Sequence, residues 1–313
     1  MADNARLFRI SSQAPLIQLI ISLFVIVVAG LLIATLLILA GALIFNTSPE
    51  ELLKIPTSVS GTHETIILKY IQVSQQIALF LIPSLIIARL LKSDGSAFLK
   101  TDKAPPLFTL LIVIILAVLI IPVTTYAGYI NSGMDLPDRF SGLENWMITK
   151  EDEARELTSL MITSSGVLTL SVNIVVMALI PAISEEFLFR GVFQQLFGRV
   201  LRSPQAGLWI SALIFSTIHL QFYGFIPRLI LGLVFGYLFY WTANMWIAIA
   251  AHFANNGLLV VIAYMKELRS GTPETINEQS LKVDFPFIPV ILSCLVIYFL
   301  WHEFRGAGKP GNN

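Results

Sequence analysis

The sequence predicts an all-α, polytopic membrane protein with about eight transmembrane helices. Three observations support this fold class. Of the 313 residues, 56% are hydrophobic and only 13% are charged, whereas charged residues make up roughly 25% of a soluble domain. The formal net charge is zero, with 20 basic against 20 acidic residues. The apolar residues also gather into eight runs, most of them close to the length of about 20 residues that crosses a bilayer.

The same composition excludes several classes of protein. A surface with few charges and no net charge is poorly suited to water, a nucleic-acid binder needs a basic stripe, and a disordered chain needs high polarity. Cys294 is the only cysteine, which excludes an intrachain disulfide and a cysteine-based zinc site. We therefore expect membrane lipids as partners and no nucleic acid. The oligomeric state does not follow from the sequence.

The expected spans follow one another without an internal repeat or a linker, so we expect one membrane domain over residues 1–313. The first apolar run covers about 30 residues, longer than the roughly 7–15 apolar residues of a signal peptide, so we expect it to be retained as a span. In chain order the spans are Leu16–Phe45, Thr65–Leu91, Leu107–Ile130, Met161 to about Phe189, Gln205–Phe222, Phe225–Trp241, Met245–Tyr264 and Phe287–Trp301.

The connecting segments indicate an orientation. The long acidic segment before the fourth span contains a short expected surface helix, Lys150–Met161. Eight spans place both termini on one side, and short segments on that side carry bases such as Arg6, Arg9 and Lys92, which favours the cytoplasm. We therefore expect a multi-pass integral protein of a bacterial cell membrane, with both termini cytoplasmic.

Three charged residues lie inside an apolar run, where each charge is costly. They are Glu185, Glu186 and Arg190. Glu186 and Arg190 have the i, i+4 spacing of a helical ion pair, with the acid in the favourable N-terminal position. Glu185 is turned by about 100° on the same helix, so this pair does not account for it. One carboxylate is therefore left to face something else.

Two of the four histidines, His219 and His252, also lie in apolar runs, and Asn256 follows His252 by one helical turn. With Glu185 they form a plausible hydrolytic set. A glutamate in an apolar site is suited to act as general base for water. One histidine can orient that water, while the other histidine and the amide donate hydrogen bonds to a developing oxyanion. A single intramembrane histidine, by contrast, often only bridges two helices.

Metal binding is the competing chemistry, because two histidines and a glutamate are also a zinc ligand set. The ligands would be Glu185, His219 and His252. The sequence lacks the His-Glu-x-x-His pattern that would support zinc strongly. We expect no required cofactor, with a divalent metal such as zinc as the alternative.

Three patterns in chain order resemble the motifs of the CAAX protease and bacteriocin-processing family, the group around the type II CAAX prenyl endopeptidases. They lie in the half of the chain from about residue 167 to 264, each on a separate expected span. The patterns are Glu-Glu-x-x-x-Arg at Glu185, Glu186 and Arg190, Phe-x-x-x-His at Phe215 and His219, and His-x-x-x-Asn at His252 and Asn256.

The resemblance implies a hydrolase, a membrane-embedded endopeptidase that cuts a membrane-associated or lipidated peptide. Glu185 matches the water-activating glutamate and His219 the residue that helps to hold the water. His252 and Asn256 match the oxyanion pair, and Glu186 and Arg190 match the supporting acid and base. The family is described both as intramembrane metalloproteases and as glutamate-dependent proteases. Asn256 is a poor metal ligand and a good hydrogen-bond donor, which favours the second description.

Two other functions remain open from the sequence. The first is a non-proteolytic immunity or scaffold protein of the same family. The second is a proton-coupled transporter that uses Glu185 and the histidines as a relay, although it lacks an inverted repeat.

The proposed site requires a particular length or shape of the fourth span. Glu185 reaches the depth of the two histidines only if this helix continues past Arg190 or bends at Pro181, so we expect a long or kinked helix. In the second span Gln72, Gln75 and Gln76 share one helical face, and we expect them to bridge helices or to face a cavity.

Overall fold

The computed structural model describes residues 10–54, 62–92, 94–134, 136–162, 166–270 and 287–304. In these ranges the regular secondary structure is helical, with no strand. Within the described residues, seven helices are long and apolar enough to cross a membrane, and an eighth apolar helix is shorter. The predicted all-α, multi-pass membrane fold is therefore confirmed.

The candidate spans agree with the predicted ones in order and in most bounds. Six of them are single helices, namely α1 (Pro15–Ile44), α6 (Leu107–Ser132), the shorter α11 (Pro204–Ile218), α12 (Phe225–Thr242), α13 (Met245–Ser270) and α14 (Phe287–Phe304). The second span is one continuous helix made of α3 (Thr62–Gln75), η2 (Gln76–Leu81) and α4 (Ile82–Leu91). The fourth span is one continuous helix made of α8 (Val167–Asn173), η4 (Ile174–Leu179), α9 (Ile180–Glu186), η5 (Phe187–Gln194) and α10 (Gln195–Val200). Short helices connect them, namely α2 (Pro49–Lys54), α5 (Gly95–Leu99), η3 (Asp138–Phe140) and η6 (Phe222–Gly224).

The structure corrects several predicted boundaries, among them the end of the seventh span, which lies at Ser270 instead of Tyr264. The surface helix expected at Lys150–Met161 is longer, since α7 covers Ser141–Ile162. The fourth span begins at Val167 instead of Met161. The fifth ends at Ile218 instead of Phe222, because Leu220 has a positive φ of 53° that breaks the helix.

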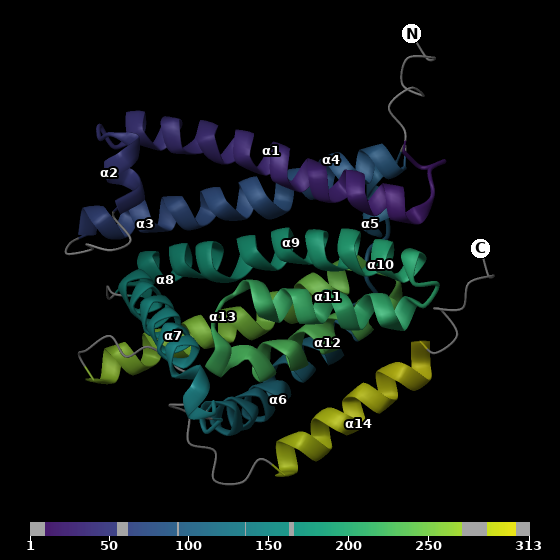
Figure 1. Cartoon of the computed structure of the whole chain (residues 1–313). Helices are drawn as coiled ribbons and strands as arrows, with labels where there is room; N and C mark the ends of the chain where they lie inside the picture. The colour runs from purple at the N-terminus through teal and green to yellow at the C-terminus, as the bar shows by residue number, and fades with distance from the viewer. Residues whose placement is uncertain are drawn as a thin grey trace.

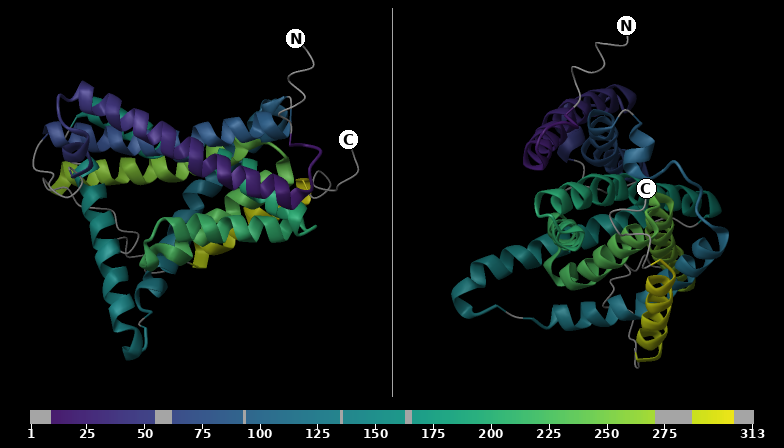
Figure 2. Two further views of the ribbon diagram at one scale, coloured as in Figure 1. Left: turned by 45° about the horizontal axis from the view of Figure 1, so that its top comes forward. Right: turned by 90° about the vertical axis from the view of Figure 1, so that its right-hand side faces the viewer.

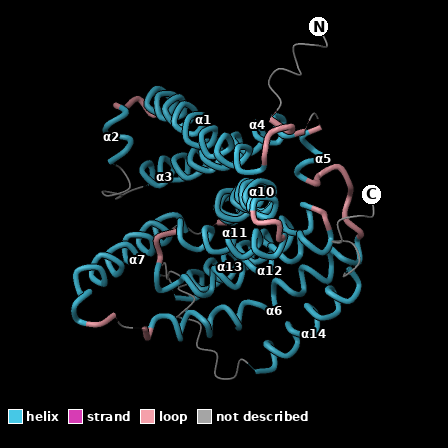
Figure 3. Tube along the Cα trace, turned by 45° about the vertical axis from the view of Figure 1, so that its right-hand side comes forward, coloured by secondary structure: helices cyan, strands magenta, loops and turns pink. Residues whose placement is uncertain are grey.

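The long fourth helix lies at the centre of the bundle. In Figure 1, α1, α3 and α4 lie on one side of the α8–α10 helix, and α11, α12 and α13 lie on the other, followed by α6 and α14. Figure 3 looks nearly along α10 and shows it between the same two groups. The helix α7 projects away from the bundle (Figure 2). In this central position Glu185, Glu186 and Arg190 are buried among neighbouring helices.

The second and fourth spans contain three π-helical stretches, η2, η4 and η5, and two of them precede a proline. Both η2 and η4 are followed within two residues by a proline, Pro83 and Pro181. Proline lacks an N–H, so the carbonyl one turn earlier loses its partner. A wider turn accommodates this loss, with Ile180 N–H bonded to the carbonyl five residues back, that of Val175. As a result, Gln76 begins a widened turn beside α9.

Candidate active site

All four residues predicted to act in catalysis line one cavity of about 290 Å³. Its walls come from α3, α7, α9, α12 and α13 and from the end of α11. The residues that carry the chemistry are Glu185, His219, His252 and Asn256, with the rings of Phe215 and Phe235 beside them. The second and third motifs, 30 or more residues downstream of Glu185 in the sequence, are thus brought to the same place by the packing of three helices.

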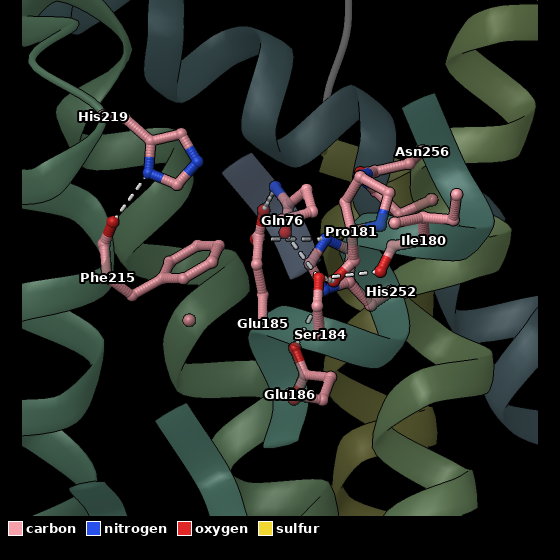
Figure 4. Close-up of polar contacts among 12 residues, drawn as sticks. Gln76, Ile180, Pro181, Ser184, Glu185, Glu186, Phe215, His219, His252 and Asn256 are labelled. Carbon is pink, nitrogen blue, oxygen red and sulfur yellow. Dashed lines mark hydrogen bonds and ion pairs between the residues drawn. The ribbon is translucent and has the colours of Figure 1, made fainter. Parts of the chain in front are cut away.

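Glu185 is held in place by a side chain from the second span. The residue is only 6% exposed, and Oε1 of its carboxylate accepts a 2.8 Å hydrogen bond from Nε2 of Gln76. The amide oxygen of Gln76 contacts the hydroxyl of Ser184, the residue before Glu185 (Figure 4). One glutamine therefore fixes both the carboxylate and the helix turn that presents it.

Glu186 joins the supporting arginine to one of the histidines. Its Oε1 accepts a bond from Arg190 Nη1 at 2.8 Å and one from His252 Nδ1, also at 2.8 Å. All three side chains are buried. The predicted Glu186–Arg190 ion pair is confirmed, whereas the bond to His252 was not predicted. A carboxylate only accepts, so His252 Nδ1 carries a proton.

Arg190 is enclosed by aromatic rings and by backbone. Its guanidinium carbon lies 5.1 Å from the ring centroid of Phe215 and 5.6 Å from that of Phe235, distances typical of a cation–π contact. Its Nη2 donates to the carbonyl of Gly232 at 3.0 Å. Phe235 also stacks on the His252 ring with centroids 5.0 Å apart. These contacts fix the plane of the His252 ring, with its Nε2 3.9 Å from Glu185 Oε2.

His219 lies just beyond the last residue of α11. Its Nδ1 is 2.7 Å from the carbonyl oxygen of Phe215, and because a carbonyl only accepts, Nδ1 carries the proton. In the neutral ring Nε2 is then an acceptor. In the view of Figure 4, Glu185 appears between His219 and His252. The predicted long fourth helix is confirmed, since it continues ten residues past Arg190 to Val200.

Asn256 shares the cavity with a neighbour that sequence reasoning missed. Asn255 is 2% exposed and lines the same cavity. Its Nδ2 donates to Asn256 Oδ1 at 3.3 Å. Since the oxygen end of the Asn256 amide is used in this way, its NH2 group is the end left to act as a donor.

The predicted metal ligands line one cavity but do not form a compact ligand set. Among the described residues, no three His, Cys, Asp or Glu side chains lie close enough together to hold a metal ion. Both histidines do have the outer hydrogen bond that ligand histidines usually make, His252 to Glu186 and His219 to a carbonyl. In this arrangement, however, Glu185, His219 and His252 do not fit a three-ligand zinc site.

The glutamine prediction holds in part. Gln76 bridges the second and fourth spans and Gln72 lines the cavity. Gln75, by contrast, is exposed. The pattern of three glutamines was a usable signal for a polar face, but it did not identify which glutamine meets Glu185.

Comparison with known proteins gives a family match over the segment that carries the three motifs. Residues 167–258 match the family model described as type II CAAX prenyl endopeptidase Rce1-like. This segment runs from α8 into α13 and includes every residue of the three motifs. The resemblance seen in the motifs is therefore confirmed over this part of the chain, and it indicates a membrane hydrolase at the level of the family.

A curated relative matches a stretch of comparable length. The uncharacterized protein YpbD of Bacillus subtilis (strain 168) is 32% identical over 85 residues, which cover 26% of this chain and 40% of that protein. The chain thus spans less than half the length of the curated relative it matches. No solved structure matches the chain.

Proposed function

We propose that this protein is a membrane-embedded endopeptidase in which Glu185 activates water to hydrolyse a peptide bond. The observation that carries the proposal is the buried Glu185 carboxylate, held by Gln76 at the wall of the cavity that His219, His252 and Asn256 also line. A positioned base contributes about 10²–10⁴-fold to a hydrolysis. The match to the endopeptidase family over residues 167–258 supports the same reaction class.

The first step is attack of water on the peptide carbonyl carbon. The water donates one hydrogen bond to Glu185 and the other to Nε2 of His219, which is free to accept because Nδ1 is bound to the Phe215 carbonyl. Glu185 takes a proton as the new C–O bond forms. The carbonyl oxygen then carries a negative charge.

His252 and Asn256 stabilise that charge. In this proposal His252 carries a proton on each ring nitrogen, because only an N–H can donate to an oxyanion. With Nδ1–H bound to Glu186, the second N–H, on Nε2, is available to the oxyanion. The Asn256 NH2 group is the other donor.

The second step breaks the C–N bond. The oxyanion collapses and Glu185 returns its proton to the leaving nitrogen, so the products are one carboxylic acid and one amine. Glu185 ends ionised, as it began. His219, His252 and Asn256 remain unchanged after the cycle.

The substrate class follows from where the cavity lies. Its walls include Leu231, Leu259 and Val260 on helices long and apolar enough to cross a membrane, so an apolar or lipid-anchored peptide fits it better than a soluble charged one. The substrate is then a membrane-associated or lipidated peptide.

The test uses the purified full chain in vesicles with two probes, an S-farnesylated peptide and an apolar leader-type peptide, and mass spectrometry of the products. We expect cleavage of at least one probe by wild type and none by Glu185→Ala. Cleavage is expected to continue in a chelator. Loss of cleavage on chelation, restored by zinc, would instead assign Glu185, His219 and His252 to a metal site. Equal cleavage by wild type and Glu185→Ala would contradict the proposal.

A further inference from the structure

The cavity wall contains a buried polar atom that the proposed reaction does not use. Asn255 lines the cavity and is only 2% exposed, yet its Oδ1 has no hydrogen-bond partner among the described residues. The other end of the same amide is used, since Nδ2 donates to Oδ1 of Asn256 at 3.3 Å. Leaving a buried acceptor unpaired costs free energy, so this oxygen requires an explanation. At the wall of a binding cavity, a donor group on the ligand supplies one.

The position at the cavity distinguishes Asn255 from another buried asparagine of the bundle. Asn173 is 3% exposed, and its Oδ1 also lacks a hydrogen-bond partner among the described residues. It is the last residue of α8, however, and it is not one of the residues that line the cavity. The two asparagines therefore differ in whether a ligand in the cavity can reach them, which makes Asn173 a matched control.

The neighbours of Asn255 indicate the kind of group that it binds. On α13 it lies three residues after His252 and one before Asn256, and all three line the cavity. This part of the wall thus presents an acceptor beside the two side chains assigned to the oxyanion. A peptide main chain has both a carbonyl and an N–H in each residue except proline, so it can satisfy the donors and the acceptor together. Apolar substrate side chains supply no such donor.

The bond between the two asparagines limits how far this N–H lies from the reacting carbonyl. The oxygen and nitrogen of one amide are about 2.2 Å apart, so the 3.3 Å bond places Asn255 Oδ1 at most about 8 Å from Asn256 Nδ2. Asn256 Nδ2 is the proposed donor to the oxyanion. An extended peptide covers about 3.3 Å per residue, so this distance corresponds to about two substrate residues.

We propose that Asn255 binds the substrate main chain, with its Oδ1 accepting a hydrogen bond from a backbone N–H within about two residues of the peptide bond that is cut. The inference rests on the proposed endopeptidase function, because that function places the peptide in this cavity. Recognition of this kind does not depend on the substrate side chains. It excludes a proline or an N-methylated residue at the position whose N–H is bound.

The test measures binding of an apolar peptide from which single N–H groups are removed. The probe is acetyl-Ala-Leu-Val-Leu-Ala-Leu carboxamide, together with the analogues that each carry one N-methyl group on the main chain. The Kd of each is measured by titration against the full chain in a Glu185→Gln background, where cleavage is expected to be slow. To this background are added Asn255→Leu, Asn255→Asp or the control Asn173→Leu.

In the background alone we expect one N-methylation to raise Kd about 5- to 30-fold more than the others, as the loss of one buried hydrogen bond gives. Asn255→Leu should remove this difference, and Asn173→Leu should keep it. Asn255→Asp keeps an acceptor oxygen and loses the donor to Asn256, so it should keep part of the difference. Mass spectrometry of the parent peptide cut by the chain with Glu185 gives the cut bond, and the sensitive N–H should lie within about two residues of it.

A residue that only holds Asn256 in place would give a different result. Asn255→Leu would then raise the Kd of every analogue by the same factor and preserve the difference between positions, which overturns the proposal. Equal Kd values for all analogues with Asn255 intact overturn it as well, whether or not Asn255→Leu folds. Where Asn255→Leu does not fold, Asn255→Ala removes the same oxygen and gives the same comparison.

The outcomes also separate this inference from the proposed function. Cleavage of the parent peptide with N-methyl effects that do not depend on Asn255 contradicts the role of Asn255 alone. An N-methyl effect that depends on Asn255, without cleavage of any probe peptide by the chain with Glu185, supports that role and contradicts the proposed endopeptidase function alone.

Discussion

At the scale of single residues, the site consists of groups that are buried and mutually oriented. Glu185 is bound by Gln76, and Glu186 is bound by both Arg190 and His252. The two adjacent glutamates therefore have different surroundings, since Glu185 lines the cavity and Glu186 is bound by Arg190 and His252. Because both residues are glutamates, this difference in environment is the reason to assign the general-base role to Glu185 and the role of supporting acid to Glu186.

Gln76→Leu tests whether the bond to Glu185 matters for the reaction. Leucine keeps the approximate volume and removes the donor, so Glu185 loses a charge-assisted hydrogen bond of about 1.5–3 kcal/mol. We expect kcat to fall about 10- to 100-fold with KM nearly unchanged. The matched control is Gln75→Leu, since Gln75 is exposed on the same helix. Equal kcat values for the two variants would show that Gln76 does not position the base.

Glu186→Ala tests the buried ion pair through stability. Removing this carboxylate leaves Arg190 buried without its partner, and breaking a buried pair costs about 3–5 kcal/mol. Asp152→Ala breaks the exposed pair with Arg155, where the expected cost is about 0–1 kcal/mol. Thermal unfolding in detergent should show a large fall in Tm for the first variant and little change for the second. Similar Tm values for both would mean that the buried pair does not stabilise the fold.

Sequence reasoning found the charged residues of the site because few charges occur in apolar runs, so Glu185 and Arg190 stand out. It did not find the bond from Gln76 to Glu185. These residues are 109 positions apart, and one sequence carries no information on which polar face of one span meets another. The bond between His252 and Glu186 was missed for the same reason, and the i, i+4 pattern had already given Glu186 a partner.

At the scale of elements, the site depends on close helix packing around the fourth span. Inside a bilayer, helices gain little from the hydrophobic effect when they associate, so small residues that permit close contact matter more. The clearest case is the crossing of α10 and α11, where a Cβ on Gly207 would lie less than 3.0 Å from the backbone of Gly198. This contact sets the position of α11 and hence of His219 at its end.

Gly207→Ala should therefore separate α10 from α11. The added methyl group meets backbone, which cannot rotate away, and overpacking of this kind costs about 1–3 kcal/mol. We expect a lower Tm and reduced activity. The control Gly142→Ala adds a methyl group in α7 where nothing lies within 4 Å, and it should be neutral or slightly stabilising. An unchanged Tm for Gly207→Ala would mean that the close crossing is not required.

The lengths of most spans could be predicted because apolar length in a sequence maps directly onto helix length in a bilayer. The end of α11 could not, because Leu220 and Phe222 continue the apolar run although the helix has stopped. The backbone turns at Leu220 with a positive φ, and no glycine or proline at that position signals the turn in the sequence.

At the scale of the whole molecule, the arrangement agrees with an even number of crossings. The first turn of α1 and the last turn of α14 lie at the same end of the bundle in Figures 1 and 2. The site residues come from both halves of the chain, since Gln76 lies outside the segment that matches the endopeptidase family. The segment from 167 to 258 is therefore expected to need the N-terminal spans for activity.

Thiol labelling tests this orientation. Cys294 is the only cysteine, so Cys294→Ala gives a background without thiols. In that background Ser12→Cys and Glu303→Cys should react with an impermeant maleimide from the cytoplasmic side, and Gly142→Cys from the opposite side, because an odd number of expected spans separates Gly142 from either end. Labelling of all three from one side would contradict the topology.

The general-base role of Glu185 is tested most directly by the single-turnover cleavage rate of Glu185→Gln on whichever probe peptide the wild type cuts. Glutamine preserves size and can still hydrogen-bond, but it cannot accept the proton from water. We predict a loss of about 10²–10⁴-fold, with a Tm close to that of wild type and full activity in the exposed control Glu50→Gln. A folded Glu185→Gln protein that cuts the peptide at the wild-type rate would contradict the assignment.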